Sequence, residues 1–103
     1  SGFKGTGSSI AYVACKAAID TMSLSLARVL GPEIRVNCVS PGAVATDFVA
    51  GRDREKLKKL SENSPLQKVV EPEDVALAIM TYITHLKHST GARIIVDSGN
   101  FLK

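Results

Sequence analysis

Tyr12 and Lys16 are the residues whose types and spacing could do chemistry. They stand four positions apart, so in a helix their side chains lie one turn apart on the same face. An ammonium group close to a phenol favours the phenolate, which makes the phenol proton easier to transfer at neutral pH. The pair could therefore act as a general acid or base, although such pairs also occur as surface tyrosines packed on a lysine stem.

A second candidate site is the turn that Pro41 and Gly42 predict after a short strand. Ligands of open α/β sheets bind outside the C-terminal ends of the strands, and glycine lets backbone approach a ligand closely. By themselves, however, these residues are also consistent with an ordinary turn. Thr46 with Asp47 could in the same way do no more than cap the next helix.

The other chemically reactive residue types lack the spacing of a site. Cys15 and Cys38 have no CxxC pattern, so we expect buried, reduced thiols. His85 and His88 lie near a predicted helix end without a third ligand, and we expect surface histidines and no metal site. No strand precedes Gly5-Thr6-Gly7, which predicts a loop rather than a dinucleotide fingerprint.

A long helix must position Tyr12 and Lys16. The glycine- and serine-rich residues 1–9 predict a loop, Ser8 or Ser9 could cap a helix over residues 11–30, and Gly31-Pro32 would end it. Its expected apolar face consists of Cys15, Ala18, Ile19, Met22, Leu26 and Val29. Further apolar positions at Ala14, Ala17, Leu24 and Leu30 predict cover on two sides, by a sheet and by another helix or a subunit.

Two strands and two shorter helices are expected after it. Residues 34–39 and 93–96 have the β-branched pattern of buried strands. Residues 53–61 form a polar helix or mobile segment with Leu57 and Leu60 to bury. A helix should start at residues 71–74, with an apolar face of Val75, Ala76, Ile79, Met80 and Ile83. This order is typical of the end of a doubly wound α/β sheet, and two strands alone cannot make a stable parallel sheet, so we expect a piece of a longer chain.

Composition indicates one globular domain or less. The 103 residues are 45% hydrophobic and 22% charged, and 13 basic residues are interleaved with 10 acidic ones for a net charge of +3. This balance does not favour a nucleic-acid partner. We expect no membrane span, because no apolar run reaches about 18 residues, and no signal peptide, which leaves a cytoplasmic enzyme as the expectation.

The motifs together resemble the short-chain dehydrogenase/reductase family. Residues 12–18 are similar to its active-site helix, and the resemblance continues through Gly31-Pro32, residues 34–37, Pro41-Gly42, Thr46, residues 71–76 and residues 90–99. Residues 1–103 would form the C-terminal part of one NAD(P)-binding, Rossmann-like domain with a doubly wound parallel sheet, its N-terminal half absent. Cys15 stands where serine is common, and Asp97-Ser98-Gly99-Asn100 where aspartate and two glycines are common.

The resemblance implies an oxidoreductase that moves a hydride between a nicotinamide and a carbonyl or alcohol. Tyr12 would be the general acid or base, and Lys16 would assist it and bind the nicotinamide ribose hydroxyls. Val44 would offer backbone to the carboxamide, and Thr46 a hydroxyl to the cofactor. The full set of implied cofactor contacts is Tyr12, Lys16, Pro41, Gly42, Val44 and Thr46.

The family's catalytic serine and glycine-rich phosphate loop would lie upstream of Ser1, so we expect the chain alone to be inactive. The cofactor would be NAD(P)(H), with NADP(H) slightly preferred although its selecting residue is absent. The substrate would be a small carbonyl or alcohol, and the enzyme would resemble the 3-oxoacyl-carrier-protein reductases in layout. The full-length protein would be a homodimer or homotetramer. Two alternatives stay open: a catalytically dead oligomerisation or binding module, and a natural half-protein that completes its sheet with a partner subunit.

Overall fold

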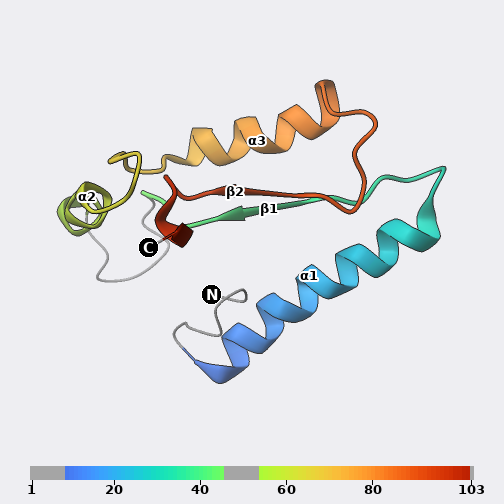
Figure 1. Ribbon diagram of the computed structural model, residues 1–103, viewed down its shortest axis with the longest axis horizontal. Helices are drawn as coiled ribbons and strands as arrows, with labels where there is room; N and C mark the ends of the chain where they lie inside the picture. The colour runs from blue at the N-terminus through green and yellow to red at the C-terminus, as the bar shows by residue number, and fades with distance from the viewer. Residues whose placement is uncertain (1–8, 46–53, 103) are drawn as a thin grey trace. The chain divides into compact units, whose positions relative to one another are not determined.

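The computed structural model describes residues 9–45 and 54–102. Its elements follow in the order α1 (Ile10–Leu30), β1 (Cys38–Pro41), α2 (Arg54–Glu62), α3 (Pro72–Thr84), β2 (Arg93–Val96) and a 3-10 helix, η1 (Asn100–Leu102) (Figure 1). The chain divides into two compact units. The first unit runs to Cys38 and includes His88–Ala92, and the second unit holds Val39–Lys87 and Arg93–Lys103.

Helix α1 forms where the sequence predicts it. The Oγ of Ser9 accepts a hydrogen bond of 3.1 Å from the backbone N–H of Tyr12, which satisfies one of the free donors at the helix start. The helix ends at Leu30, and Gly31 as its C-cap has extended backbone. Both predicted ends are therefore confirmed, with one additional residue at the start.

The face of α1 that packs within its own unit is not the predicted apolar face. The residue of the helix that is buried is Ala27, and a Cβ built on Gly91 would lie 3.6 Å from the Ala27 Cβ, so backbone packs closely there. Ile19, Met22 and Val29 of the predicted face are 47%, 55% and 70% exposed. The helix lies against its own unit through small side chains that permit close approach, which leaves its bulky apolar side chains outward.

The predicted strand over residues 34–39 is shorter and starts later, at Cys38. Before that point the N–H of Gly91 donates to the carbonyl of Val36 at 2.8 Å, and side chains supply the other hydrogen bonds: the N–H of Val36 donates to Thr90 Oγ1 at 3.1 Å. The amide of Asn37 donates to the carbonyl of Ser89 at 2.9 Å and accepts from the N–H of Ala92 at 3.1 Å. These contacts hold the first unit together without forming a regular strand.

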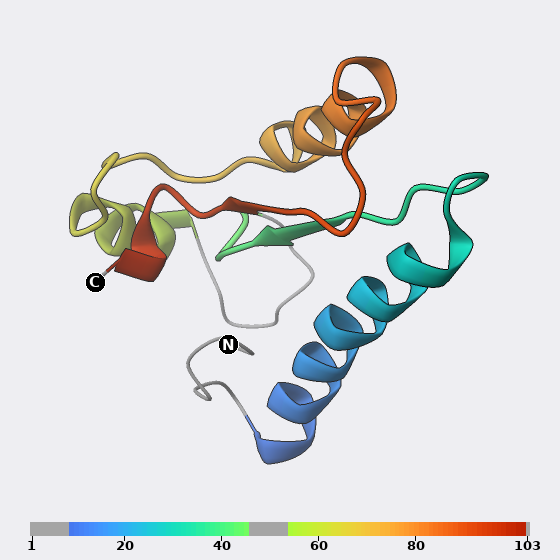
Figure 2. The same ribbon diagram turned by 45° about the vertical axis from the view of Figure 1, so that its right-hand side comes forward.

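In the second unit, β1 and β2 pair, and the predicted second strand is confirmed at its predicted bounds. The N–H of Gly42 donates to the carbonyl of Val96 at 3.0 Å, just beyond β1. At the other end of β1, Cys38 donates to Ala92, so both partners advance in the same direction and the strands are parallel. Helix α3 belongs to the connection between them and runs beside β2 (Figure 1, Figure 2).

Helix α3 begins after Glu71 as predicted, but its predicted apolar face is largely wrong. Tyr82 is the buried residue of the helix, and Val75 and Ala78 on the same side are half-buried. The predicted members Ala76, Ile79, Met80 and Ile83 are exposed. Apolar residues occur on both sides of this helix, so their spacing alone does not say which side meets the sheet.

Helix α2 confirms a helical segment after residue 53. Leu57, which is 4% exposed, is buried as predicted, whereas Leu60 is 57% exposed. Apart from these two leucines, the helix carries mainly charged side chains.

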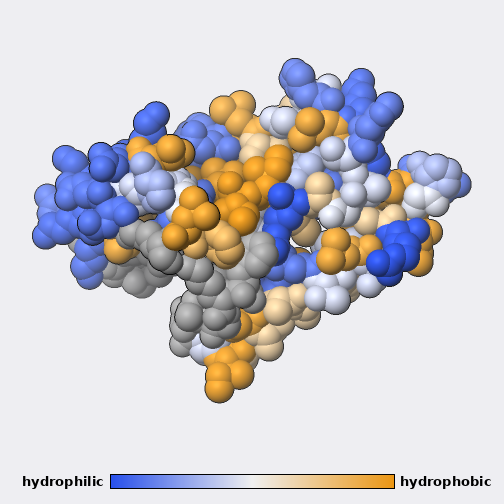
Figure 3. All heavy atoms as spheres, in the orientation of Figure 1, coloured by the Kyte–Doolittle hydropathy of each residue, from blue (hydrophilic) through white to orange (hydrophobic). Residues whose placement is uncertain are grey.

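The core of the described residues is small. The buried apolar side chains are Ala27, Leu57, Val70 and Tyr82, and no side chain there is completely buried. Apolar side chains instead lie at the surface of α1 and of α3 (Figure 3). A two-stranded sheet with so little cover agrees with the expectation that further structure completes the fold.

Candidate active site

Helix α1 brings Tyr12 and Lys16 together as their spacing predicts. The Nζ of Lys16 lies 5.4 Å from the centroid of the Tyr12 ring, within the range of a cation–π contact. Tyr12 is 46% exposed, so its phenol is open to a ligand. Apart from this ring contact, the Lys16 ammonium has no hydrogen bond or ion pair in the described part of the chain, which leaves its N–H donors for another group.

Strand β1 includes Pro41, and Gly42 follows it in the second unit, at the C-terminal end of a parallel strand; the chain bends only at Ala43, so the turn predicted at Pro41 and Gly42 comes later. A Cβ on Gly42 would lie 2.7 Å from the Cβ of Asp97, closer than carbon atoms pack. Position 42 therefore requires glycine because Asp97, the residue after β2, leaves no room for a Cβ. The sequence suggested a different reason, close approach of backbone to a cofactor, and the contact with Asp97 was not foreseen.

Just after Gly42, Val44 and Ala45 pair with the backbone of the buried residue Val70. Val44 forms an isolated parallel bridge with Val70, and the N–H of Ala45 donates to the carbonyl of Val70 at 3.0 Å. Val70 is 6% exposed, so the backbone of Val44 is supported from within the second unit. Thr46, the next predicted cofactor contact, lies outside the described residues.

Asp97 organises the turn after β2. Its Oδ1 accepts from the N–H of Gly99 at 2.9 Å, and its Oδ2 accepts from the N–H of Phe101 at 2.8 Å. The next residue, Ser98, donates its hydroxyl to the carbonyl of Lys68 at 2.6 Å. Asp97 thus holds the turn after β2, and it is also the residue that Gly42 approaches closely. In the sequence, residues 97–100 differ from the aspartate and two glycines that are common in the family. An aspartate followed by Ser-Gly-Asn is nevertheless typical of turns in which the aspartate side chain accepts from backbone N–H groups.

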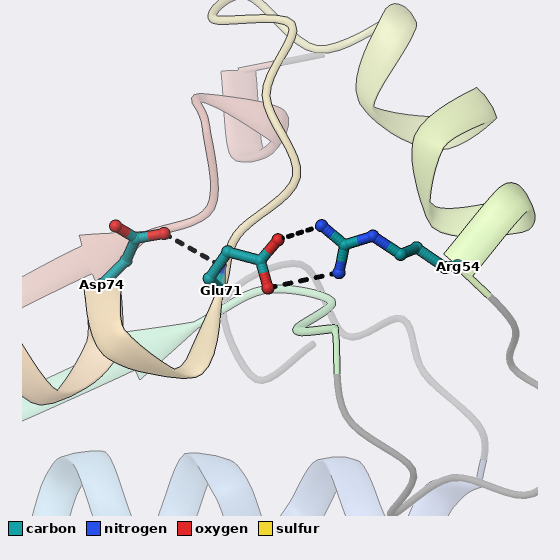
Figure 4. A network of polar contacts seen from close by, with 3 residues as sticks. All are labelled: Arg54, Glu71 and Asp74. Atoms are coloured by element: carbon teal, nitrogen blue, oxygen red, sulfur yellow. Dashed lines mark hydrogen bonds and ion pairs between the residues drawn. The ribbon is translucent and has the colours of Figure 1, made fainter.

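Arg54, Glu71 and Asp74 form a polar network that the sequence did not reveal (Figure 4). Arg54 Nη1 donates to Glu71 Oε2 at 3.3 Å, and Nη2 forms an ion pair with Oε1. The hydrogen bond with Glu71, and then its negative charge, raise the pKa of Arg54 above the ordinary value. Arg54 belongs to the segment of residues 53–61, which the sequence predicts to be a polar helix or mobile segment. Only the helix start at Glu71 could be foreseen, because the partners are 17 positions apart.

The remaining reactive side chains form no site in the part of the chain that the structure describes. His85 and His88 are exposed as predicted, and no cluster of possible metal ligands occurs among the described residues. Cys15 and Cys38 form no disulfide among the described residues, but Cys15 is exposed and Cys38 half-buried, so the prediction that both are buried is wrong. Cys15 is exposed because it lies on the side of α1 that its own unit leaves uncovered.

Comparison with known proteins identifies the family. A family model described as enoyl-(acyl carrier protein) reductase matches residues 1–100. The short-chain dehydrogenase/reductase homologue YusR of Bacillus subtilis (strain 168) is 46% identical over 101 residues, which cover 98% of this chain and 77% of YusR. The chain belongs to the short-chain dehydrogenase/reductase family.

Other family members match over a smaller share of their length. A 3alpha-hydroxysteroid dehydrogenase of Mediterraneibacter gnavus is 40% identical over 95 residues, which cover 90% of this chain and 38% of that enzyme. A crystal structure of a short-chain dehydrogenase/reductase from Burkholderia xenovorans has a TM-score of 0.84 and 40% identity, and the match covers 99% of this chain and 38% of that one. The chain therefore spans about two fifths of these dehydrogenases and corresponds to a C-terminal part of their Rossmann-like fold.

Two further solved structures contain nicotinamide cofactors. A small-chain dehydrogenase in complex with NADPH has a TM-score of 0.77 and 34% identity, with 88% of this chain and 42% of that one covered. A 4-hydroxyisoleucine dehydrogenase complexed with NADH has a TM-score of 0.85 and 25% identity, with 99% of this chain and 44% of that one covered.

The family also bears on the apolar character of α1. By length and composition this 21-residue helix could cross a membrane, contrary to the expectation from the sequence. The core helix of a soluble enzyme meets the same criterion, and the matches to dehydrogenase structures cover 99% of the chain and so include α1. Its apolar surface is therefore better explained by protein packing than by lipid.

Proposed function

We propose that this chain is the C-terminal part of an NAD(P)-dependent oxidoreductase acting on a small carbonyl or alcohol. The observation that carries the proposal is the Tyr12–Lys16 pair, with Lys16 Nζ 5.4 Å from the Tyr12 ring centroid on a helix of this family. A cofactor of this kind supplies a hydride at its nicotinamide ring. Tyr12 gives a proton to the substrate oxygen when the carbonyl is reduced, and takes it back when the alcohol is oxidised.

Lys16 has two tasks in this mechanism. Its ammonium lies beside the phenol that transfers the proton, with Nζ 5.4 Å from the centroid of the Tyr12 ring. Its N–H donors bind the hydroxyls of the nicotinamide ribose, so one side chain assists Tyr12 and orients the cofactor. The exposed Tyr12 ring fits these tasks, and so does the Lys16 ammonium, whose only contact among the described residues is with that ring.

The cofactor's nicotinamide end is held by the chain after β1. Pro41 ends β1 and Gly42 follows it, so both lie at the C-terminal end of the strand, where Rossmann-like sheets bind their ligands. Val44, held on Val70, offers its backbone to the carboxamide, and Thr46 adds a hydroxyl. Relatives with NADPH and with NADH support a nicotinamide cofactor of either kind, and we retain NADP(H) as slightly preferred.

The test is a pair of substitutions in the complete enzyme. Tyr12→Phe keeps the ring but removes the proton, so it should abolish turnover while NADH or NADPH still binds. Lys16→Ala should weaken both cofactor binding and turnover. Cofactor binding is followed by nicotinamide fluorescence, and turnover by absorbance of the reduced nicotinamide. A Tyr12→Phe enzyme that kept most of its activity would contradict the mechanism.

A second candidate is a natural half-protein that completes its sheet with a partner subunit. It is favoured by YusR, because the 101 aligned residues already make up 77% of that relative. Mass measured in solution separates the two: a half-protein should form a defined complex with its partner, whereas a fragment should associate unspecifically through its apolar surface.

The exposed apolar side of α1 also supports self-association of the complete enzyme. Ile19, Met22, Leu26 and Val29 form one stripe that the described residues leave uncovered, and a homodimer or homotetramer would bury it. We also propose a cytoplasmic location for the enzyme.

A further inference from the structure

Two separate stretches of chain are tied to the neighbouring residues Val70 and Glu71. Ala45 donates its N–H to the carbonyl of Val70 at 3.0 Å, beside the Val44–Val70 bridge. Arg54, the first residue of α2, binds the Glu71 carboxylate with both of its terminal nitrogens (Figure 4). Ala45 and Arg54 are nine positions apart in the sequence, so both ends of the intervening chain meet at one place.

Glu71 is itself held firmly enough to serve as an anchor. Its N–H donates to Asp74 Oδ2 at 2.8 Å, and the N–H of Asp74 donates to the Glu71 carbonyl at 3.0 Å. Pro72 follows as the first residue of α3 and restricts the backbone further. The backbone of Glu71 is thus fixed to α3, while its carboxylate is free to hold Arg54.

The two ties support each other. Each closes the same stretch of chain, and the entropy lost when one forms need not be lost again for the other. Opening the Arg54–Glu71 pair therefore gives Ala45 more freedom to leave Val70. The pair is exposed, with side-chain accessibilities of 68% and 34%, so this effect is expected to be moderate.

We propose that Arg54 and Glu71 are a positioning pair that keeps Val44 and Ala45 on Val70 and thereby sets the affinity for the nicotinamide end of the cofactor. This rests on the proposed function, in which the Val44 backbone binds the carboxamide. Neither Arg54 nor Glu71 touches cofactor or substrate. Both act through the backbone that Val70 supports.

The experiment measures hydrogen exchange of the Ala45 amide and the dissociation constants of NADH and NADPH in the complete protein. Glu71→Gln removes the charge that holds Arg54, and Glu73→Gln is the matched control. Glu73 lies in the same first turn of α3 and has no hydrogen bond or ion pair in the described part of the chain. For Glu71→Gln we expect about two- to five-fold faster exchange and a similar rise in the dissociation constant, the size of effect known for exposed ion pairs.

Exchanging the two charges tests whether the pair itself is responsible. Arg54→Glu combined with Glu71→Arg should recover exchange protection and cofactor affinity that either single substitution loses. Unchanged Ala45 exchange in Glu71→Gln, or an equal effect in Glu73→Gln, would overturn the proposal. So would faster exchange with unaltered affinity. A wild-type protein that binds neither cofactor would instead refute the proposed function, and the Ala45 exchange would still decide whether the pair holds Val44 and Ala45.

Discussion

Replacing Gly42 by alanine should destabilise the second unit measurably. The added Cβ would lie 2.7 Å from the Cβ of Asp97 and 3.3 Å from its Cα. Carbon atoms in contact are normally about 3.5–4.0 Å apart, so the overlap is about 1 Å. Both atoms are at the base of the Asp97 side chain, and no rotation of that side chain moves them away.

The overlap must therefore be relieved by moving backbone. The segment after β1 would shift from the end of β2, which lengthens the 3.0 Å hydrogen bond from Gly42 to Val96. Inserting a methyl group into packed surroundings costs about 1–3 kcal/mol. With a slope of about 1–3 kcal/mol per molar urea, this loss moves the unfolding midpoint down by about 1 M.

Urea unfolding followed by circular dichroism in the complete protein measures this shift, and Gly31→Ala is the matched control. The nearest atom to a Cβ on Gly31 is the Ala27 carbonyl oxygen at 3.8 Å, an ordinary contact. The extended backbone of Gly31 also suits alanine, which should be neutral or stabilising by about 0.4–1 kcal/mol. If Gly42→Ala unfolded at the same urea concentration as Gly31→Ala, the close approach to Asp97 would be refuted.

Two further substitutions test the helices. Leu57→Ala should lower the free energy of unfolding by about 2–5 kcal/mol because Leu57 is 4% exposed, whereas Leu60→Ala, at a position 57% exposed, should have little effect; equal losses would show that α2 packs differently. Ser9→Ala removes the cap of α1 and should cost about 0.5–2 kcal/mol by thermal unfolding, while Ser25→Ala at an exposed position of the same helix should not destabilise. A Ser9→Ala protein as stable as Ser25→Ala would contradict the assigned cap.

Local chemistry made part of the fold predictable. The start of α1 at a serine cap and its end before Gly31-Pro32 depend on neighbouring residues alone, and so does the start of α3 after Glu71. The Tyr12–Lys16 contact was predictable for the same reason, because a helix fixes the distance between positions four apart. The family motif around this pair is equally a property of the sequence.

Packing decided what periodicity could not. Helix α1 has bulky apolar residues on one side and small ones on another, and the small side around Ala27 packs within its own unit. The apolar pattern predicted the bulky side, because the pattern shows which side chains are apolar. It does not show whether the same unit or another part of the protein covers them. In α3 apolar residues also occur on both sides of the helix, so the pattern did not indicate that Tyr82 is the buried residue.

The sequence by itself determined both ends of α1, the start of α3, the Tyr12–Lys16 contact and the family, since each depends on residues within a few positions of one another or on motifs spread in order along the chain. Only the tertiary structure decided why Gly42 is glycine and what Arg54 binds. Gly42 and Asp97 are 55 positions apart and meet only after the chain has crossed from β1 through α3 to β2. Arg54 and Glu71 are 17 positions apart and meet only because the chain returns after α2 to the start of α3. No local pattern encodes a contact that depends on how separate elements come together.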